Sequence, residues 1–299
     1  MSTRFRSADA FKQSLEDRIR REAEALGLKV QPFRQRCIFD RFLARLLSHF
    51  GDRAILKGGV ALALLVPRAR LTKDVDLTLH GRSENLLDEV QTAGRIDLGD
   101  FLVFEALPHA DHPTIEGEGI VYEGLRFQIH TRLAGKRYGD PFGLDVAFGD
   151  RMLVPPELRT GNDFFQFAGL PPTKIRAYAR EVHLAEKLHA YTQPRPRENS
   201  RVKDLPDMAL LATTGPFDGD TLRRTIEATF TFRAVHPTPA SLPAPPASWP
   251  APYARLAREN ALPWPTLEAV FTHVSAFLDP ILTGHDGTWD PIAWTWRAR

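Results

Sequence analysis

Two short segments of the sequence contain residues that could together bind a nucleotide and a metal ion. Residues 56–59 read Leu-Lys-Gly-Gly, and residues 74–77 read Asp-Val-Asp-Leu. In an extended strand alternate side chains share a face, so Asp74 and Asp76 would project together while Val75 packs the other way. Two carboxylates held this close repel each other unless a cation lies between them, and Mg2+ prefers such oxygen ligands. The second segment therefore predicts a site for a divalent cation.

The glycine pair has the properties that a bound phosphate requires. Gly58 and Gly59 allow a positive φ and a close approach of the backbone to a ligand. A helix expected over residues 60–65 would offer unpaired backbone N–H groups at its start, where phosphates bind. Either segment alone is commonly an ordinary turn or a solvated strand end, but their coincidence indicates nucleotide chemistry.

This arrangement resembles the nucleotidyltransferases of the DNA polymerase β type, in which a Gly-Gly or Gly-Ser turn and a short helix precede Asp-x-Asp. Within that superfamily the chain is most similar to the AbiEii toxin family, which includes the mycobacterial MenT toxins. The resemblance covers residues 50–215 and rests on three further motifs, which read Arg-Leu-Thr-Lys-Asp-Val-Asp at 70–76, Lys-Leu-His-Ala at 187–190 and Arg-Val-Lys-Asp-Leu-Pro-Asp at 201–207. Pro206 departs from the family pattern because it interrupts the last motif.

The resemblance implies an α/β fold of the α+β type. Residues 1–178 would form a polymerase β-like nucleotidyltransferase domain with two leading helices and a mixed sheet, and residues 179–299 a helical C-terminal domain that completes the cleft. The implied activity is that of a toxin from a toxin–antitoxin system, which transfers NMP from an NTP to the 3′ end of tRNA and so blocks translation. Mg2+ or Mn2+ is the implied cofactor, and the implied partners are NTP, tRNA and a cognate antitoxin protein.

The resemblance also implies roles for individual residues. Those expected to be catalytic are Asp74, Asp76, Lys187 and Asp204, and those expected to bind the nucleotide are Lys57, Gly58, Gly59, Thr72 and Lys187. In the MenT toxins a serine at the Thr72 position resembles a regulatory phosphorylation site, and a phosphate there would add negative charge beside the carboxylates. Without the resemblance, Lys187 could equally be a solvated lysine paired with a neighbouring glutamate, and Asp207 could be structural.

Asp145 is a candidate third metal ligand, beside Asp74 and Asp76, on general chemical grounds. Phosphoryl transfer with two metal ions uses carboxylates that bridge both ions. Asp145 lies in an expected strand among apolar residues, where an unpaired charge would be costly, so it should have a partner. Asp150, just beyond this strand, is a better candidate for a strand-end cap.

Composition permits this function without requiring it. The 299 residues are 43% hydrophobic and 25% charged, enough for two domains with a substantial core. The sequence shows neither an apolar leader nor a long apolar run, which predicts no membrane association and a cytoplasmic location. Cys37 is the only cysteine, which excludes a cysteine-rich zinc site, and its apolar helical surroundings favour core packing. His183 and His189 are expected to be packing or surface residues because their spacing does not suit a zinc site.

Hydrophobic periodicity predicts a mixed sheet with helices packed on it, followed by a helical region. The expected helices cover residues 8–26, 32–50, 60–65, 83–93 with Ser83 as cap, 180–191, 203–213, 218–233 and 265–278. The expected strands cover residues 54–57, 74–79, 101–107, 119–133, 143–148 and 173–178. The proline-dense residues 236–252 predict either an extended connection or a segment wrapped over the surface.

Two other functions stay open at this point. A small-molecule nucleotidyltransferase of the aminoglycoside-modifying kind would share the aspartates but present an acidic pocket to a cationic substrate. A non-catalytic NTP-sensing module would bind NTP without turnover. An RNA acceptor is favoured by the cations around the later motifs, although charges also gather on ordinary solvated helices. These cations are Lys174, Arg176, Arg180, Arg195, Arg197, Arg201 and Lys203.

Overall fold

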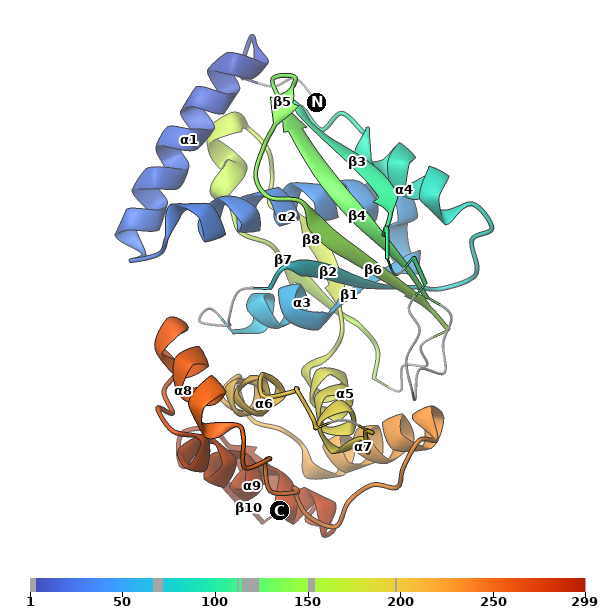
Figure 1. The fold of residues 1–299 in the computed structure, drawn as a ribbon, viewed down its shortest axis with the longest axis vertical. Helices are drawn as coiled ribbons and strands as arrows, with labels where there is room; N and C mark the ends of the chain where they lie inside the picture. Colours follow the sequence, from blue (N-terminus) through green and yellow to red (C-terminus); the bar gives the residue numbers. More distant parts are fainter. Residues whose placement is uncertain are drawn as a thin grey trace.

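One mixed β-sheet and a group of helices below it make up the chain in the computed structural model (Figure 1). The structure describes residues 4–66, 72–111, 113–114, 124–149, 154–196 and 198–298. The sheet part ends with the last strand of this sheet at Ala177, and the helical part begins at Arg180. This is the mixed α/β class that the sequence predicts. No helix in the described ranges is both long enough and apolar enough to cross a bilayer.

The sheet combines parallel and antiparallel pairs. Its strands are β1 (Ala54–Lys57), β2 (Asp74–Leu79), β3 (Leu102–Pro108), β4 (Gly124–Leu133), β5 (Lys136–Arg137), β6 (Phe142–Phe148), β7 (Glu157–Thr160) and β8 (Lys174–Ala177). They lie in the order β3-β4-β6-β2-β1-β8-β7, with β5 paired to β4. The central strand β2 runs antiparallel to β1 and parallel to β6. The carboxylate strand is therefore flanked on both sides by other strands.

The first hydrophobic cluster lies between the sheet and three helices. These are α1 (Ala8–Ala25), α2 (Val30–Phe50), which ends in the 3-10 turn Gly51–Arg53, and α4 (Leu86–Gly94). Phe42 of α2 packs against Phe104 and Phe142, with ring centroids 5.0 and 5.3 Å away. Cys37 is buried in the same cluster, which confirms its predicted packing role. A second 3-10 turn, Phe164–Ala168, adds aromatic rings beside α1.

Helix α3 (Gly58–Leu65) contributes to both hydrophobic clusters. Its Ala61 packs under the sheet, whereas Leu62 and the following Val66 belong to the second cluster. That cluster contains α5 (Arg180–Thr192), α6 (Asp204–Ala212), α7 (Gly219–Arg233), α8 (Pro250–Glu259), α9 (Leu267–Leu282) and the hairpin of β9 (Thr288–Asp290) and β10 (Thr295–Arg297). A domain boundary at residue 178 stays a prediction, because a divided core does not show that either part folds alone.

Two expectations from the sequence are wrong or incomplete. Helix α4 begins at Leu86, and the Ser83 hydroxyl donates to the Glu89 carboxylate instead of capping the helix. The proline-dense segment is a wrapped one, because its Leu242 and Trp249 are buried in the second cluster. It also ends in α8, which the sequence reading missed: Pro250 stands at the first helical position, where no intrahelical N–H bond is needed.

A buried ion network ties α2 to the start of β3. Asp100 accepts hydrogen bonds from Arg41 Nε at 2.7 Å and Arg45 Nη1 at 2.9 Å, and all three side chains are almost fully buried. Burial alone would raise the pKa of Asp100, but the hydrogen bonds and charges of Arg45 and Arg41 hold it below its ordinary value. Arg45 thus depends on Asp100 for its charge balance, whereas Arg41 also has a longer ion pair with Asp40 at 3.8 Å.

We expect Asp100→Ala to lower the free energy of unfolding by about 3–5 kcal/mol, because it leaves Arg45 buried without a carboxylate and Arg41 with only the longer pair to Asp40. Urea denaturation measures this loss. The control is Asp88→Ala on the exposed side of α4, whose stability should stay within about 0.5 kcal/mol of wild type.

The pH dependence tests the ionic origin of this stabilisation. Because the pKa of Asp100 is lowered in the folded state, the stabilisation is present above the pKa of the unfolded state and is lost as pH falls through the pKa of the folded state. The difference in free energy of unfolding between the variant and wild type should therefore become smaller at acid pH. A difference that does not change with pH would contradict an ionic origin of the stabilisation.

Candidate active site

Strand register places four charged residues in one row across the sheet. Lys57 of β1 pairs with Asp76 of β2, Asp76 with Asp145 of β6, and Asp145 with Arg126 of β4. Residues in register on neighbouring strands point to the same face of a sheet. We call these four residues the charge row. Two carboxylates lie at its centre and one cation at each end, so the predicted partner of Asp145 is Arg126.

Glycines pack directly against the carboxylates of β2. A Cβ on Gly58 would lie 1.9 Å from Asp76 Oδ2, and one on Gly143 would lie 2.5 Å from Asp74 Oδ1. Gly58 has a φ of +66°, as the turn prediction requires. Gly59 approaches Thr72 in the same way, with its added Cβ 2.8 Å from the hydroxyl oxygen. No side chain fits between the start of α3 and these residues, so the glycine turn and the Asp-x-Asp strand form one unit.

The helical part supplies a second set of charges from α5 and α6. Lys187 Nζ lies 2.7 Å from Asp207 Oδ2 and 3.7 Å from Asp204 Oδ1. Asp207, which the sequence reading left as structural, therefore makes the shorter bond to this lysine. Glu186 pairs with Arg233 and is not the partner of Lys187.

Pro206 does not interrupt the last motif. It lies in the first turn of α6, where backbone N–H groups have no intrahelical acceptor. The helix therefore begins at Asp204 and presents Asp204 and Asp207 one turn apart.

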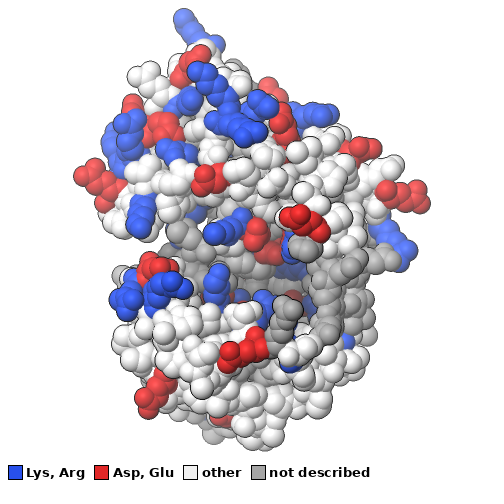
Figure 2. All heavy atoms as spheres, viewed as in Figure 1, with Lys and Arg blue, Asp and Glu red and all other residues white. Residues whose placement is uncertain are grey.

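A hollow lies between the sheet part and the helical part (Figure 2). Figure 2 shows this hollow, with basic side chains on both sides of it. Burial first, and then the charge of Asp145, raises the pKa of Asp76 to about 6. Lys57 and Lys187 oppose this shift, so Lys187 acts on the sheet strand from the other part of the chain. The structure thus brings Asp76, Lys57 and Lys187 into one site.

Two buried side chains line the same junction without carrying charge. Burial, and after it the charge of Lys187, lowers the pKa of His183 to about 3, so the imidazole is neutral. Tyr178 bonds to the Thr78 hydroxyl at 3.0 Å and stacks edge-on with His183 at 5.7 Å. His189 is also buried, so both histidines are packing residues as expected.

The site fits a divalent cation. Asp74 and Asp76 offer hard oxygen ligands, and burial together with the neighbouring Asp145 raises the pKa of Asp76, a cost that a bound cation would reduce. No three His, Cys, Asp or Glu side chains in the described ranges form a ready-made metal cluster. Mg2+ commonly binds through one or two carboxylates and completes its shell with water and substrate phosphates, which matches this pair. Both oxygens of Asp145 accept hydrogen bonds from Arg126.

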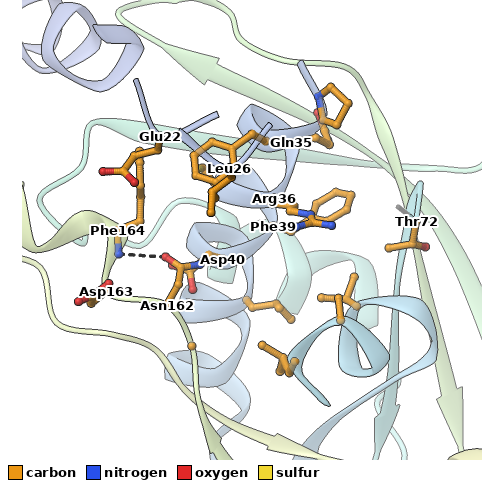
Figure 3. Close-up of a pocket in the computed structure, with 18 of the residues that line it drawn as sticks. Glu22, Leu26, Gln35, Arg36, Phe39, Asp40, Thr72, Asn162, Asp163 and Phe164 are labelled. Carbon is orange, nitrogen blue, oxygen red and sulfur yellow. Dashed lines mark hydrogen bonds between the residues drawn. The ribbon is translucent and has the colours of Figure 1, made fainter. Parts of the chain in front are cut away.

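A separate cavity adjoins the site behind α3. It has a volume of about 880 Å³ and lies between α1, α2, α3 and residues 160–167. Phe39, Asp40, Asn162 and Phe164 line its interior, and Thr72 stands at its edge (Figure 3). Burial raises the pKa of Asp40 to about 6. The carboxylate pair of β2 does not line this cavity.

The cations around the later motifs do not form one patch. Arg176 pairs with Asp52 at 2.7 Å, and the guanidinium of Arg180 lies over the Phe217 ring at 4.1 Å. These two arginines are therefore engaged in the fold. Of the described cations in this group, Lys174, Arg195, Arg201 and Lys203 are exposed. The last three lie in the connection between α5 and α6, next to Asp204. Arg70, Leu71, Asp150 and Arg197 lie outside the described residues.

A mixed sheet that carries a glycine turn, a carboxylate pair and a lysine from a helical part defines a nucleotidyltransferase. Residues 41–273 match the family described as "Nucleotidyl transferase AbiEii toxin, Type IV TA system". This match covers more than half of the chain, and the chain belongs to that family. A comparison with curated proteins finds no match.

Solved structures agree with this fold. MenT4, a nucleotidyltransferase toxin from Mycobacterium tuberculosis H37Rv, is similar with a TM-score of 0.58 at 19% identity, over 93% of this chain and 92% of MenT4. JHP933 from Helicobacter pylori has a TM-score of 0.43 at 15% identity, over 67% of this chain and 80% of JHP933, a likeness too distant to carry an argument. The likeness to MenT4 shows the fold that the sequence resemblance predicts.

We expect Gly58→Ala to abolish most nucleotide and metal binding, because its Cβ would displace the Asp76 carboxylate. Gly81→Ala is the matched control: its φ of +82° is also positive, but nothing lies within 4 Å of the added Cβ. Both variants should lose about 1–2 kcal/mol of stability from the left-handed backbone. The shift in melting temperature on adding Mg2+ and NTP measures binding. An equal shift in both variants would show that the close approach to Asp76 has no functional role.

Proposed function

We propose that this chain is the toxin of a toxin–antitoxin system and transfers a nucleoside monophosphate from an NTP to the 3′ end of tRNA, with Mg2+ or Mn2+ as cofactor. The observation that carries the proposal is the charge row, in which Asp76 lies between Lys57 and Asp145, with Lys187 of the helical part near enough for its charge to lower the pKa of Asp76. The acceptor hydroxyl would attack the α-phosphate, and pyrophosphate would leave. Addition of a nucleotide to the tRNA end would block translation, and a cognate antitoxin would restrain the toxin.

Residues of the sheet part would hold the nucleotide and the cation. Asp74 and Asp76 would be the metal ligands, and Gly58 and Gly59 would place the N-terminus of α3 against the phosphates. A bound Mg2+ would neutralise phosphate charge and lower the pKa of the attacking hydroxyl. Thr72, beside Gly59, would lie near the terminal phosphate, so a phosphoryl group on its hydroxyl would repel the nucleotide.

Residues of the helical part would complete the site. Lys187 is only 12% exposed and is held by Asp207, which orients its ammonium group. A positive charge fixed in this way favours the triphosphate and the charge that develops on it during transfer. Asp204, in the same first turn of α6 as Asp207 and 3.7 Å from Lys187, would be the second catalytic residue of the helical part. The exposed cations between α5 and α6 would contact the acceptor RNA.

We expect purified protein incubated with Mg2+, each labelled NTP and total RNA to transfer label to intact tRNA, as seen on a denaturing gel. Asp76→Ala and Lys187→Ala should abolish most of the labelling while both variants keep the wild-type circular dichroism spectrum. Label found only on small metabolites would favour a small-molecule acceptor. Binding of NTP without any transfer would favour a sensing module.

We expect tRNA binding to weaken steeply with salt, because phosphate contacts release counterions. The double variant Arg195→Ala/Lys203→Ala should lower the slope of log K against log salt by about one unit per lost contact. Arg21→Ala, an exposed position on α1, is the matched control and should leave the slope unchanged. A slope that is the same in all three proteins would mean that the connection between α5 and α6 does not touch RNA.

A further inference from the structure

Arg126 and Asp145 form a two-pronged ion pair at the end of the charge row. Arg126 Nε donates to Asp145 Oδ1 at 2.7 Å, and Nη2 donates to Oδ2 at 2.6 Å. The two residues are in register on the antiparallel strands β4 and β6, so the sheet itself fixes their separation. This geometry uses one whole edge of the guanidinium and both oxygens of the carboxylate.

The second edge of the same guanidinium has no acceptor among the described residues and could bind another oxyanion. An arginine carries five N–H donors, and Asp145 takes two of them. Within the described chain no other acceptor contacts this side chain, which keeps 35% of its surface exposed. The edge formed by Nη1 and Nη2 therefore remains available for a second bidentate contact, of the kind that arginine makes with phosphate.

The position of this edge suits a nucleotide phosphate. Arg126 lies two strands from Asp76, which corresponds to about 10 Å between the backbones. Its hydrogen bond to Asp145 raises the pKa of Arg126, and the charges of Asp74 and Asp76 contribute, so the guanidinium lies beside the proposed metal ligands. A polyphosphate bound to a cation on Asp74 and Asp76 would bring further negative charge toward Arg126.

We propose that Arg126 binds the polyphosphate of the nucleotide and that Asp145 is a positioning residue for Arg126 instead of a metal ligand. The inference rests on the proposed function and adds a substrate-binding residue to it. A metal ion on Asp145 would have to displace a bidentate guanidinium from a rigid strand pair. If the Arg126–Asp145 pair is retained, Asp74 and Asp76 remain as ligands for the metal ion. The phosphates then meet the Arg126 guanidinium in a fixed orientation.

The test measures binding of inorganic tripolyphosphate by calorimetry at fixed Mg2+, which requires neither turnover nor a known base. Arg126→Ala should raise the dissociation constant about ten- to a hundredfold, as expected for the loss of charge-assisted hydrogen bonds. Asp145→Asn should weaken binding through the same residue, so the double variant should be no weaker than Arg126→Ala alone. Arg126→Lys should restore only part of the affinity because it keeps the charge but not the fork.

The matched control is Arg132→Ala. Arg132 lies on the same strand and face as Arg126 and pairs with Glu105 at 2.7 Å, but six residues farther along β4 it is about 20 Å from Arg126. This variant should bind tripolyphosphate like wild type.

Three results would overturn the inference. Wild-type affinity in Arg126→Ala would remove its role in phosphate binding. Additive losses in the double variant, together with a raised Mg2+ requirement in Asp145→Asn alone, would make Asp145 a metal ligand. Failure of wild-type protein to bind tripolyphosphate would overturn the inference together with the proposed function, whereas the first two results leave the proposed function standing.

Discussion

Repulsion among three carboxylates on neighbouring strands is the interaction around which the site is organised. Strand register sets Asp76 beside Asp145, and the two-residue period of β2 places Asp74 on the same face. Such a group destabilises the folded chain unless cations approach it, and burial increases the cost. Lys57 and Arg126 balance part of this negative charge within the sheet. The remaining negative charge supports the proposal of a metal ion and a nucleotide at this site.

The site requires both hydrophobic clusters because its charges come from both. Helix α3 begins against the carboxylates and then sends Leu62 and Val66 into the helical part. The packing that buries these apolar residues therefore also sets the distance between β2 and α5. The charge of Lys187 acts on Asp76 only as a result of that packing, and Asp207 holds the lysine in place. Burial of apolar surface and positioning of catalytic charge are thus parts of one arrangement.

Much of the fold was predictable because long elements carry a strong hydrophobic period. The helices around residues 8–26 and 180–191 and the strand at 74–79 lie where periodicity places them. Elements that lack such a period were missed. Strand β7 is short and lies at the sheet edge, the hairpin strands β9 and β10 have three residues each, and α8 opens with prolines. The conformation of such elements depends on tertiary contacts: in β9, for example, the indole of Trp289 donates to the Ala212 carbonyl.

The sequence by itself determined the shared face of Asp74 and Asp76 and the need for glycine at Gly58. Both follow from local geometry: the period of a strand and the cost of a Cβ at positive φ. Tertiary structure alone decided that Arg126 holds Asp145 and that Asp207 holds Lys187. Strand register and helix packing set these contacts between residues distant in sequence, and no local pattern encodes which strand lies beside which.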